Sequence, residues 1–281
     1  MVRARADLHT HSSASDGSDS PSELVRKADA MELGGIALTD HDSLDGLEEF
    51  LKTKVSDELK RVPGLEISAE YEKTEVHILG YFVPMDSKPL NDRLEFLRKA
   101  RHERLPKMIR KLNELGMDIT IDELYEDLEG VASPGRPHVA QALIKKGYVK
   151  TTLEAFQKYL ATDKPAFVKK ERMDALEAVR LLKSVRAVPV LAHPLTIKVQ
   201  DLRAFIMTLM DTGLMGVEVD YDYSFMGMYR SSDEVKDIIQ GLDVLHTGGS
   251  DYHGTIHYTG LGSVTVHIDV IHDLEKIRDE L

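Results

Sequence analysis

The sequence contains no cysteine, no long hydrophobic run and fewer basic than acidic residues. Without cysteine there are no disulfides or thiolate metal sites, so any metal ion must be held by histidine, aspartate or glutamate. No apolar run approaches the roughly 20 residues that span a membrane, and the first residues lack the apolar core of a signal peptide. We therefore expect a cytoplasmic protein without a membrane partner.

The acidic excess limits the partners further. Lysine and arginine total 36 against 48 aspartates and glutamates, a formal net charge of −12. This balance disfavours a protein that coats long nucleic acids by neutralising their phosphates. A small phosphorylated substrate remains compatible, because bound cations reverse the local field. A monomer is the default expectation.

A pair of histidines ends the first predicted strand, in Asp7-Leu8-His9-Thr10-His11. Residues two apart in a strand face the same side, so His9 and His11 lie next to each other. Two neighbouring imidazoles can bind one divalent cation. Such a pair also occurs by chance, so its meaning depends on the rest of the chain.

Strands and helices alternate through most of the 281 residues. This alternation predicts an α/β fold with a barrel of parallel strands, whose functional residues gather at the carboxyl ends of the strands. One central stretch differs, because it has helix-period charges and no convincing strand. The expected division is a first part of the barrel, a helical insertion that covers the substrate, and a second part of the barrel: 1–84, 85–165 and 166–281.

Histidines and carboxylates recur at the predicted strand ends: His9, His11, Asp16, Asp40, His41, Glu66, His77, His193, Asp251 and His253. Each also has a structural explanation. His77 suits a hydrogen-bonded core residue, Glu66 a partner of a core arginine, and Asp251 a loop cap. Their recurrence at one end of the barrel instead predicts a multinuclear metal site. A carboxylate that bridges two cations about 3.5–4 Å apart is typical of sites that activate water for attack on phosphorus.

Together these motifs resemble the PHP (polymerase and histidinol phosphatase) family. The motifs occur in family order as Asp7-Leu8-His9-Thr10-His11, Thr39-Asp40-His41-Asp42, Glu66 followed by His77, Ala192-His193-Pro194, and Gly249-Ser250-Asp251-Tyr252-His253-Gly254. The resemblance implies a distorted (β/α)7 TIM-like barrel. It also implies two or three divalent metal ions, of manganese, iron or zinc.

The resemblance implies a role for each matching residue. One metal would be held by His9, His11, Glu66 and Asp251, a second by Asp16, His41 and His253, and a third by Glu66, His77 and His193. Catalysis would depend on Glu66, His41 and Asp251. Asp7 and Asp40 would hold the ligands in place. A carboxylate at Asp16 is a hard ligand, which favours manganese.

Within the family, the likeness is strongest to members that hydrolyse nucleoside 3′,5′-bisphosphates and short RNA ends. It rests on Ser15-Asp16-Gly17, on Thr39-Asp40-His41-Asp42 and on Gly135-Arg136-Pro137-His138. The expected reaction is attack by metal-activated hydroxide on the 3′-phosphate of such a nucleotide, with short oligoribonucleotides as a further substrate.

Three residues are expected to bind substrate: Arg136 and His138 suit a second phosphate, and Lys170 resembles a phosphate-facing lysine of those members. Helix capping and packing would also explain Arg136 and His138, and Lys170 suits a solvated lysine equally well. The acidic and aromatic stretch 216–223 departs from the expected pattern and leaves the substrate open. The alternatives are a histidinol-phosphate phosphatase on the same barrel and a non-catalytic, metal-stabilised PHP module.

Overall fold

The computed structural model describes residues 3–126, 135–169, 172–255 and 259–281. The described strands are β1 (Arg5–Asp7), β2 (Gly35–Leu38), β3 (Lys60–Tyr71), β4 (Thr74–Tyr81), β5 (Met173–Asp174), β6 (Val188–Leu191), β7 (Gly216–Asp220), β8 (Leu245–Gly248) and β9 (Val266–His267). They form one sheet in the order β8-β7-β6-β4-β3-β2-β1-β9, with β5 beside β3.

The sheet curls until its ends nearly meet. Leu8 N, just after β1, donates a hydrogen bond to Gly248 O at the end of β8, at 3.3 Å. Beyond these strands, Thr10 and Tyr252 form a parallel bridge. The predicted α/β barrel is thereby confirmed, and residues 9–11 and 249–253 lie next to each other.

The strands are not all parallel, which differs from the simplest barrel. β4 runs antiparallel to both β3 and β6. The cause is the tight turn between β3 and β4, in which Glu72 and Lys73 have φ values of 46° and 70°. Positive φ at both central residues is the mark of a two-residue hairpin turn. Glu66 and His77 therefore lie within strands of this long hairpin, and not at strand ends.

Helices cover the barrel from outside: α1 (Pro21–Ala30), α2 (Leu47–Lys52), α7 (Ala175–Ser184), α8 (Leu202–Thr212), α9 (Ser232–Ile239) and α10 (Asp269–Glu280). α1 begins at the capping box that the sequence predicts. Ser20 Oγ accepts a hydrogen bond from Glu23 N, and Glu23 Oε2 accepts one from Ser20 N. Of the helices described, none is both long enough and apolar enough to cross a membrane.

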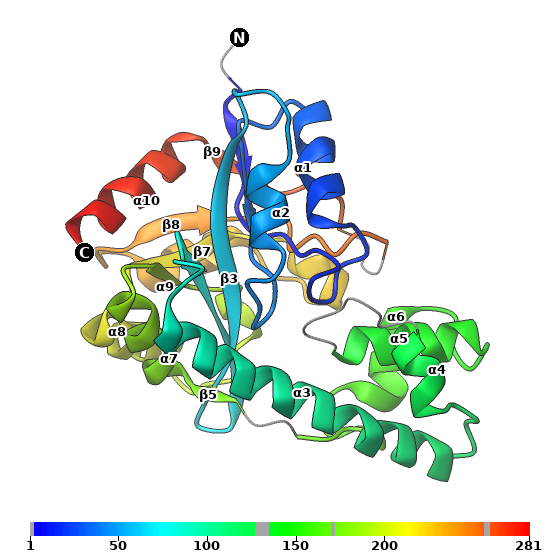
Figure 1. Ribbon diagram of the computed structural model, residues 1–281. Coiled ribbons are helices and arrows are strands. Elements are labelled where there is room, and N and C mark those ends of the chain that lie inside the picture. The colour runs from blue at the N-terminus through cyan, green and yellow to red at the C-terminus, as the bar shows by residue number, and fades with distance from the viewer. Residues whose placement is uncertain (1–2, 127–134, 170–171, 256–258) are drawn as a thin grey trace.

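The central stretch forms the expected helical insertion, with α3 (Lys88–Glu114), α4 (Ile121–Glu126), α5 (Arg136–Lys145), α6 (Thr152–Ala155) and a π-helical turn at Phe156–Leu160. Leu90 and Leu94, early in α3, pack into the core between helices and barrel. Leu112, late in α3, packs with Leu143 in a separate core of the insertion. α3 thus connects the two cores, and α4 to α6 gather at its far end (Figure 1).

Candidate metal centre

The first histidine pair directly follows β1, and its ring nitrogens converge. His9 Nε2 and His11 Nε2 lie 3.2 Å apart, and both side chains are fully buried. Asp251 Oδ1 lies 3.4 Å from His9 Nε2 and 3.2 Å from His11 Nε2. Two unprotonated ring nitrogens at this distance repel each other. The arrangement therefore requires a proton or a cation between the imidazoles and the carboxylate.

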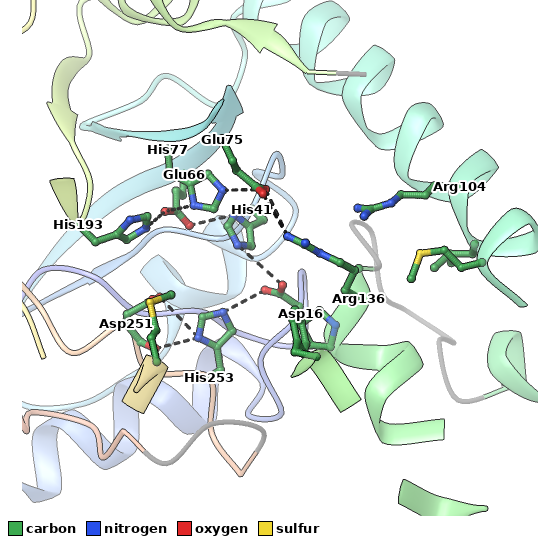
Figure 2. Close-up of a pocket in the computed structure, with 16 residues that line it drawn as sticks. Asp16, His41, Glu66, Glu75, His77, Arg104, Arg136, His193, Asp251 and His253 are labelled. Carbon is green, nitrogen blue, oxygen red and sulfur yellow. Dashed lines mark hydrogen bonds and ion pairs between the residues drawn. The ribbon is translucent and has the colours of Figure 1, made fainter. Parts of the chain in front are cut away.

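Glu66 lies at the centre of the cluster and is 1% exposed. Its Oε1 is 2.9 Å from His77 Nδ1 and 3.1 Å from His193 Nε2. Its Oε2 is 2.9 Å from His41 Nδ1. The carboxylate thus faces histidines from three separate segments, as a bridging ligand would (Figure 2).

Asp16 lies in the loop after β1 and faces the opposite side of the cluster. Its Oδ1 is 3.3 Å from His253 Nε2, and its Oδ2 is 3.8 Å from His41 Nε2. The rings of His11 and His253 stack with centroids 4.1 Å apart. These contacts bring residues from the two ends of the chain to one point.

Among the described residues, three groups of donor atoms lie within 4.8 Å of one another: His11, Asp16, His41 and His253; His9, His11 and Asp251; and His41, Glu66 and His77. The buried His11 Nδ1 makes no hydrogen bond with the described part of the protein. Clustered imidazole and carboxylate donors of this kind suit divalent transition-metal ions. The residues fit such ions, and which residues hold which ion remains a prediction.

The ionisable groups of the cluster shift one another's pKa values. Burial alone would raise the pKa of Asp16, yet the imidazoles of His41 and His253 hold it well below its usual value. Burial alone would lower the pKa of His253, yet Asp16 and Asp251 raise it to about 9. At His11, burial together with the neighbouring histidines lowers the pKa to about 3. Neutral imidazole binds a metal directly, whereas imidazolium must first release its proton.

Two buried aspartates fix the loops that carry the cluster. Asp7 accepts hydrogen bonds from Ser250 Oγ at 2.6 Å and Ser250 N at 2.9 Å, which holds the loop after β8. Asp40 accepts from Ser12 Oγ at 2.7 Å and Ser12 N at 2.8 Å, which holds the loop after β1. Burial raises the pKa of both carboxyl groups to about 6, against the lowering effect of these hydrogen bonds. Their geometry suits the predicted supporting role.

The backbone is strained where it presents cluster residues. His193 has φ 27° and Asp251 has φ 51°, a region that side chains other than glycine rarely adopt. Strain of this kind collects at functional sites, where the surrounding structure enforces it. Gly249 is required for a different reason, because a Cβ there would come 2.5 Å from His9 Cβ.

The prediction from sequence overlooked two buried residues of β7 and its following loop. Glu218 Oε1 lies 2.8 Å from His9 Nδ1, and Glu218 Oε2 lies 2.7 Å from the His193 amide nitrogen. The Tyr221 hydroxyl donates to Asp251 Oδ2 at 2.8 Å. An acidic residue between two valines of a strand was the available signal for Glu218. Glu218 and Tyr221, which belong to the acidic and aromatic stretch 216–223, therefore support the cluster.

A pocket beside the cluster has one wall from the insertion. Its lining includes Arg104, Leu105, Met108, Arg136 and Phe156. Arg136 Nη2 is 3.3 Å from Glu75 Oε2, and Glu75 Oε1 is 3.5 Å from His77 Nε2. A single side chain therefore separates Arg136 from the cluster, and Figure 2 shows Arg104 directed toward the same space. Sequence patterns gave no reason to choose Arg104 or Glu75.

The other two predicted phosphate-binding residues are less well placed or not described. His138 Nδ1 accepts a hydrogen bond from Gly135 N at 3.0 Å, a contact at the start of α5. Its contact with substrate remains a prediction. Lys170 lies outside the described residues.

Comparisons with known proteins agree with this geometry. Residues 7–161 match the model of the PHP domain. The chain is 32% identical over 189 residues to a 5′-3′ exoribonuclease of Haemophilus influenzae, covering 67% of this chain and 68% of that protein. It is 31% identical over 191 residues to a 3′,5′-nucleoside bisphosphate phosphatase of Chromobacterium violaceum, covering 68% and 67%.

A solved structure shares the whole architecture. A Bifidobacterium adolescentis protein, provisionally named a metal-dependent phosphoesterase, superimposes with a TM-score of 0.88 at 26% identity. The match covers 97% of this chain and 96% of that one. From its motifs, its barrel and the extent of the domain match, the chain belongs to the PHP domain family.

Proposed function

We propose that this PHP-family, metal-dependent phosphoesterase removes the 3′-phosphate of nucleoside 3′,5′-bisphosphates, with short oligoribonucleotides as a further substrate class. One observation carries the proposal. Arg104 and Arg136, both from the insertion, line the same pocket as the metal-binding cluster. A phosphate at the cluster and another at the arginines would match a doubly phosphorylated nucleotide. The activities named for the Haemophilus and Chromobacterium relatives support this substrate class.

On the arginine side of the pocket, guanidinium groups gather around the carboxylate of Glu75. Glu75 lies between two guanidinium groups, 3.3 Å from Arg136 Nη2 and 2.8 Å from Arg172 Nη2. Burial alone would raise the pKa of Glu75, but Arg136, His77 and Arg172 hold it well below its usual value. One carboxylate therefore faces two arginines, with Arg104 nearby. Guanidinium groups bind phosphate through two parallel hydrogen bonds, which suits this position to the second phosphate.

The chain's own residues account for binding and orientation. Phe156 lies 5.5 Å from the Arg136 guanidinium, a cation–π contact that restricts the arginine. Leu105 and Met108 form an apolar wall, and excluding water there strengthens the charge interactions of the bound substrate. Divalent ions held by the cluster would act as Lewis acids on the phosphoryl oxygens and lower the pKa of a water molecule.

The two alternative functions fit the pocket less well. Histidinol phosphate has one phosphate and an ammonium group, and the ammonium would approach arginines of like charge. A non-catalytic module would not need an open pocket beside an intact set of donors. The described cluster contains each predicted metal-binding residue, which supports an active enzyme.

The proposal is tested by Arg136→Ala. A hydrogen bond to a charged group contributes about 1.5–3 kcal/mol, so kcat/KM for a nucleoside 3′,5′-bisphosphate should fall about 10- to 100-fold. The kcat/KM for the nucleoside 3′-monophosphate should fall much less, because this substrate does not make the deleted contact. Phosphate release from both substrates at saturating manganese measures the difference.

Arg98→Ala is a matched control. Arg98, on α3, also joins the insertion to the barrel, through Asp45 at 3.0 Å, but it does not line the pocket among the residues described. In this variant, kcat/KM for both substrates should stay at the wild-type level. Equal losses for the two substrates in Arg136→Ala would contradict a bisphosphate-binding role and leave only a role in holding the insertion in place.

A further inference from the structure

Glu218 uses both of its oxygens within the cluster. It lies on β7, is fully buried, and is flanked by apolar residues of its strand. Oε1 contacts His9 Nδ1 at 2.8 Å, and Oε2 accepts from the His193 backbone amide at 2.7 Å. His9 and His193 belong to different predicted metal positions, so one carboxylate touches both.

The first contact fixes the tautomer of His9. An ionised carboxylate only accepts hydrogen bonds, so His9 Nδ1 must carry the proton. In the neutral form that binds a metal, the lone pair is then on Nε2, the atom that faces His11 Nε2 at 3.2 Å and Asp251 Oδ1 at 3.4 Å. A carboxylate behind a metal-binding histidine commonly sets its tautomer and ring orientation in this way.

The second contact fixes the backbone of His193. That residue has φ 27° and ψ 62°, a conformation that must be held in place from outside. The hydrogen bond to Glu218 Oε2 engages the amide of this strained residue. In the resulting geometry the His193 ring turns its Nε2 toward Glu66 Oε1 at 3.1 Å.

We propose that Glu218 is a positioning residue that couples two metal positions, because it sets the ligand atom of His9 and the backbone of His193 together. The inference rests on the metal-dependent function proposed above. Glu218 is not itself assigned as a metal ligand. Its effect reaches the metals only through the two histidines.

Glu218→Gln separates this role from a role in folding. The amide is isosteric, with one oxygen to accept from the His193 amide and one NH₂ group to face His9 Nδ1. The NH₂ group must donate, which moves the imidazole proton to Nε2, where it blocks the ligand atom. The hydrogen bonds stay satisfied, so the variant should fold and yet bind metal poorly.

The test measures manganese content after equilibrium dialysis of the full chain. Glu218→Gln should need about 10- to 100-fold more free manganese than wild type to reach half occupancy. Thr247→Val is the matched control, because Thr247 is fully buried and stands opposite Glu218 in the β7–β8 register. It should bind manganese like wild type. A folded Glu218→Gln variant with wild-type affinity would overturn the proposal.

A measurement on the wild-type chain decides the case if that variant does not fold. In zinc-loaded, ¹⁵N-labelled protein, NMR should show His9 protonated at Nδ1 and bound through Nε2. Metal on Nδ1, or a proton on Nε2, would overturn the proposal. Wild-type turnover of a nucleoside bisphosphate reports separately on the proposed function. Normal manganese binding without turnover would reject that substrate and leave the inference about Glu218 intact.

Discussion

Glu66 makes contacts that a smaller or uncharged side chain could not reproduce. Its two oxygens lie within 3.1 Å of ring nitrogens of His77, His193 and His41. Burial alone would raise the pKa of Glu66, but His41, His77 and His9 keep it well below its usual value. The carboxylate is therefore ionised within a set of imidazoles, where its charge also suits a bridge between two cations.

Glu66→Gln should abolish most activity. The amide removes the negative charge that two cations would share, and we expect kcat/KM to fall at least about 100-fold, a loss of about 2.7 kcal/mol in transition-state stabilisation. Bound manganese should also fall, as elemental analysis would show. Glu70→Gln is the control, because Glu70 lies on the same strand but pairs with Lys169 at 3.0 Å. Near-normal turnover in Glu66→Gln would rule out a bridging carboxylate at this position.

The sequence predicted the histidines and carboxylates that gather in the cluster more fully than the residues that support them. Histidines and carboxylates at strand ends are rare enough for their recurrence to be informative. Glu218 acts through hydrogen bonds with His9 and His193, and Tyr221 acts through one to Asp251. Neither contact follows from spacing along the chain, because each joins residues from distant segments. Only the closed barrel brings these partners together.

At the scale of elements, α3 determines how the insertion meets the barrel. Its first turns pack in the barrel core and its last turns in the core of the insertion. Arg104 lies between these regions and points into the pocket (Figure 2). The predicted metal-binding residues all come from the barrel, whereas Arg104 and Arg136 come from the insertion. Metal binding and recognition of the second phosphate should therefore be separable.

Leu143→Ala tests this separation. Leu143 is fully buried in the insertion core, and truncating such a side chain costs about 2–5 kcal/mol. We expect KM for the bisphosphate to rise and hydrogen exchange in α5 to accelerate, while manganese content stays at the wild-type level. Leu274→Ala is the contrasting variant. Leu274 lies in the hydrophobic core that includes barrel residues, so this change should lower the thermal stability of the whole protein. Loss of manganese in Leu143→Ala would show that the insertion also maintains the metal site.

The elements also show where local patterns were insufficient. The capping box at Ser20 gave the start of α1, and the change to helix-period charge located the insertion. The antiparallel hairpin of β3 and β4 was not foreseen, because Glu72 and Lys73 are unusual residues for a turn with positive φ. Pairing across the sheet fixes that turn against local preference.

At the scale of the whole molecule, the fold gathers negative charge around a site meant for an anion. The chain has a net charge of −12, and the pocket contains Asp16, Glu66, Glu75 and Asp251. Without cations, these carboxylates would repel a phosphate. Bound metal ions would reverse that negative field, and the arginines would add further positive charge. Metal binding should therefore precede substrate binding.

The number of metals bound per chain tests the central claim most directly. Protein stripped with chelator, supplied with manganese and freed of excess ion can be measured by elemental analysis. We predict two or three manganese ions per chain, because donor atoms from the barrel form three adjoining groups among the described residues. Fewer than one ion per chain after manganese is supplied would contradict a multinuclear metal centre and the phosphoester chemistry proposed for it.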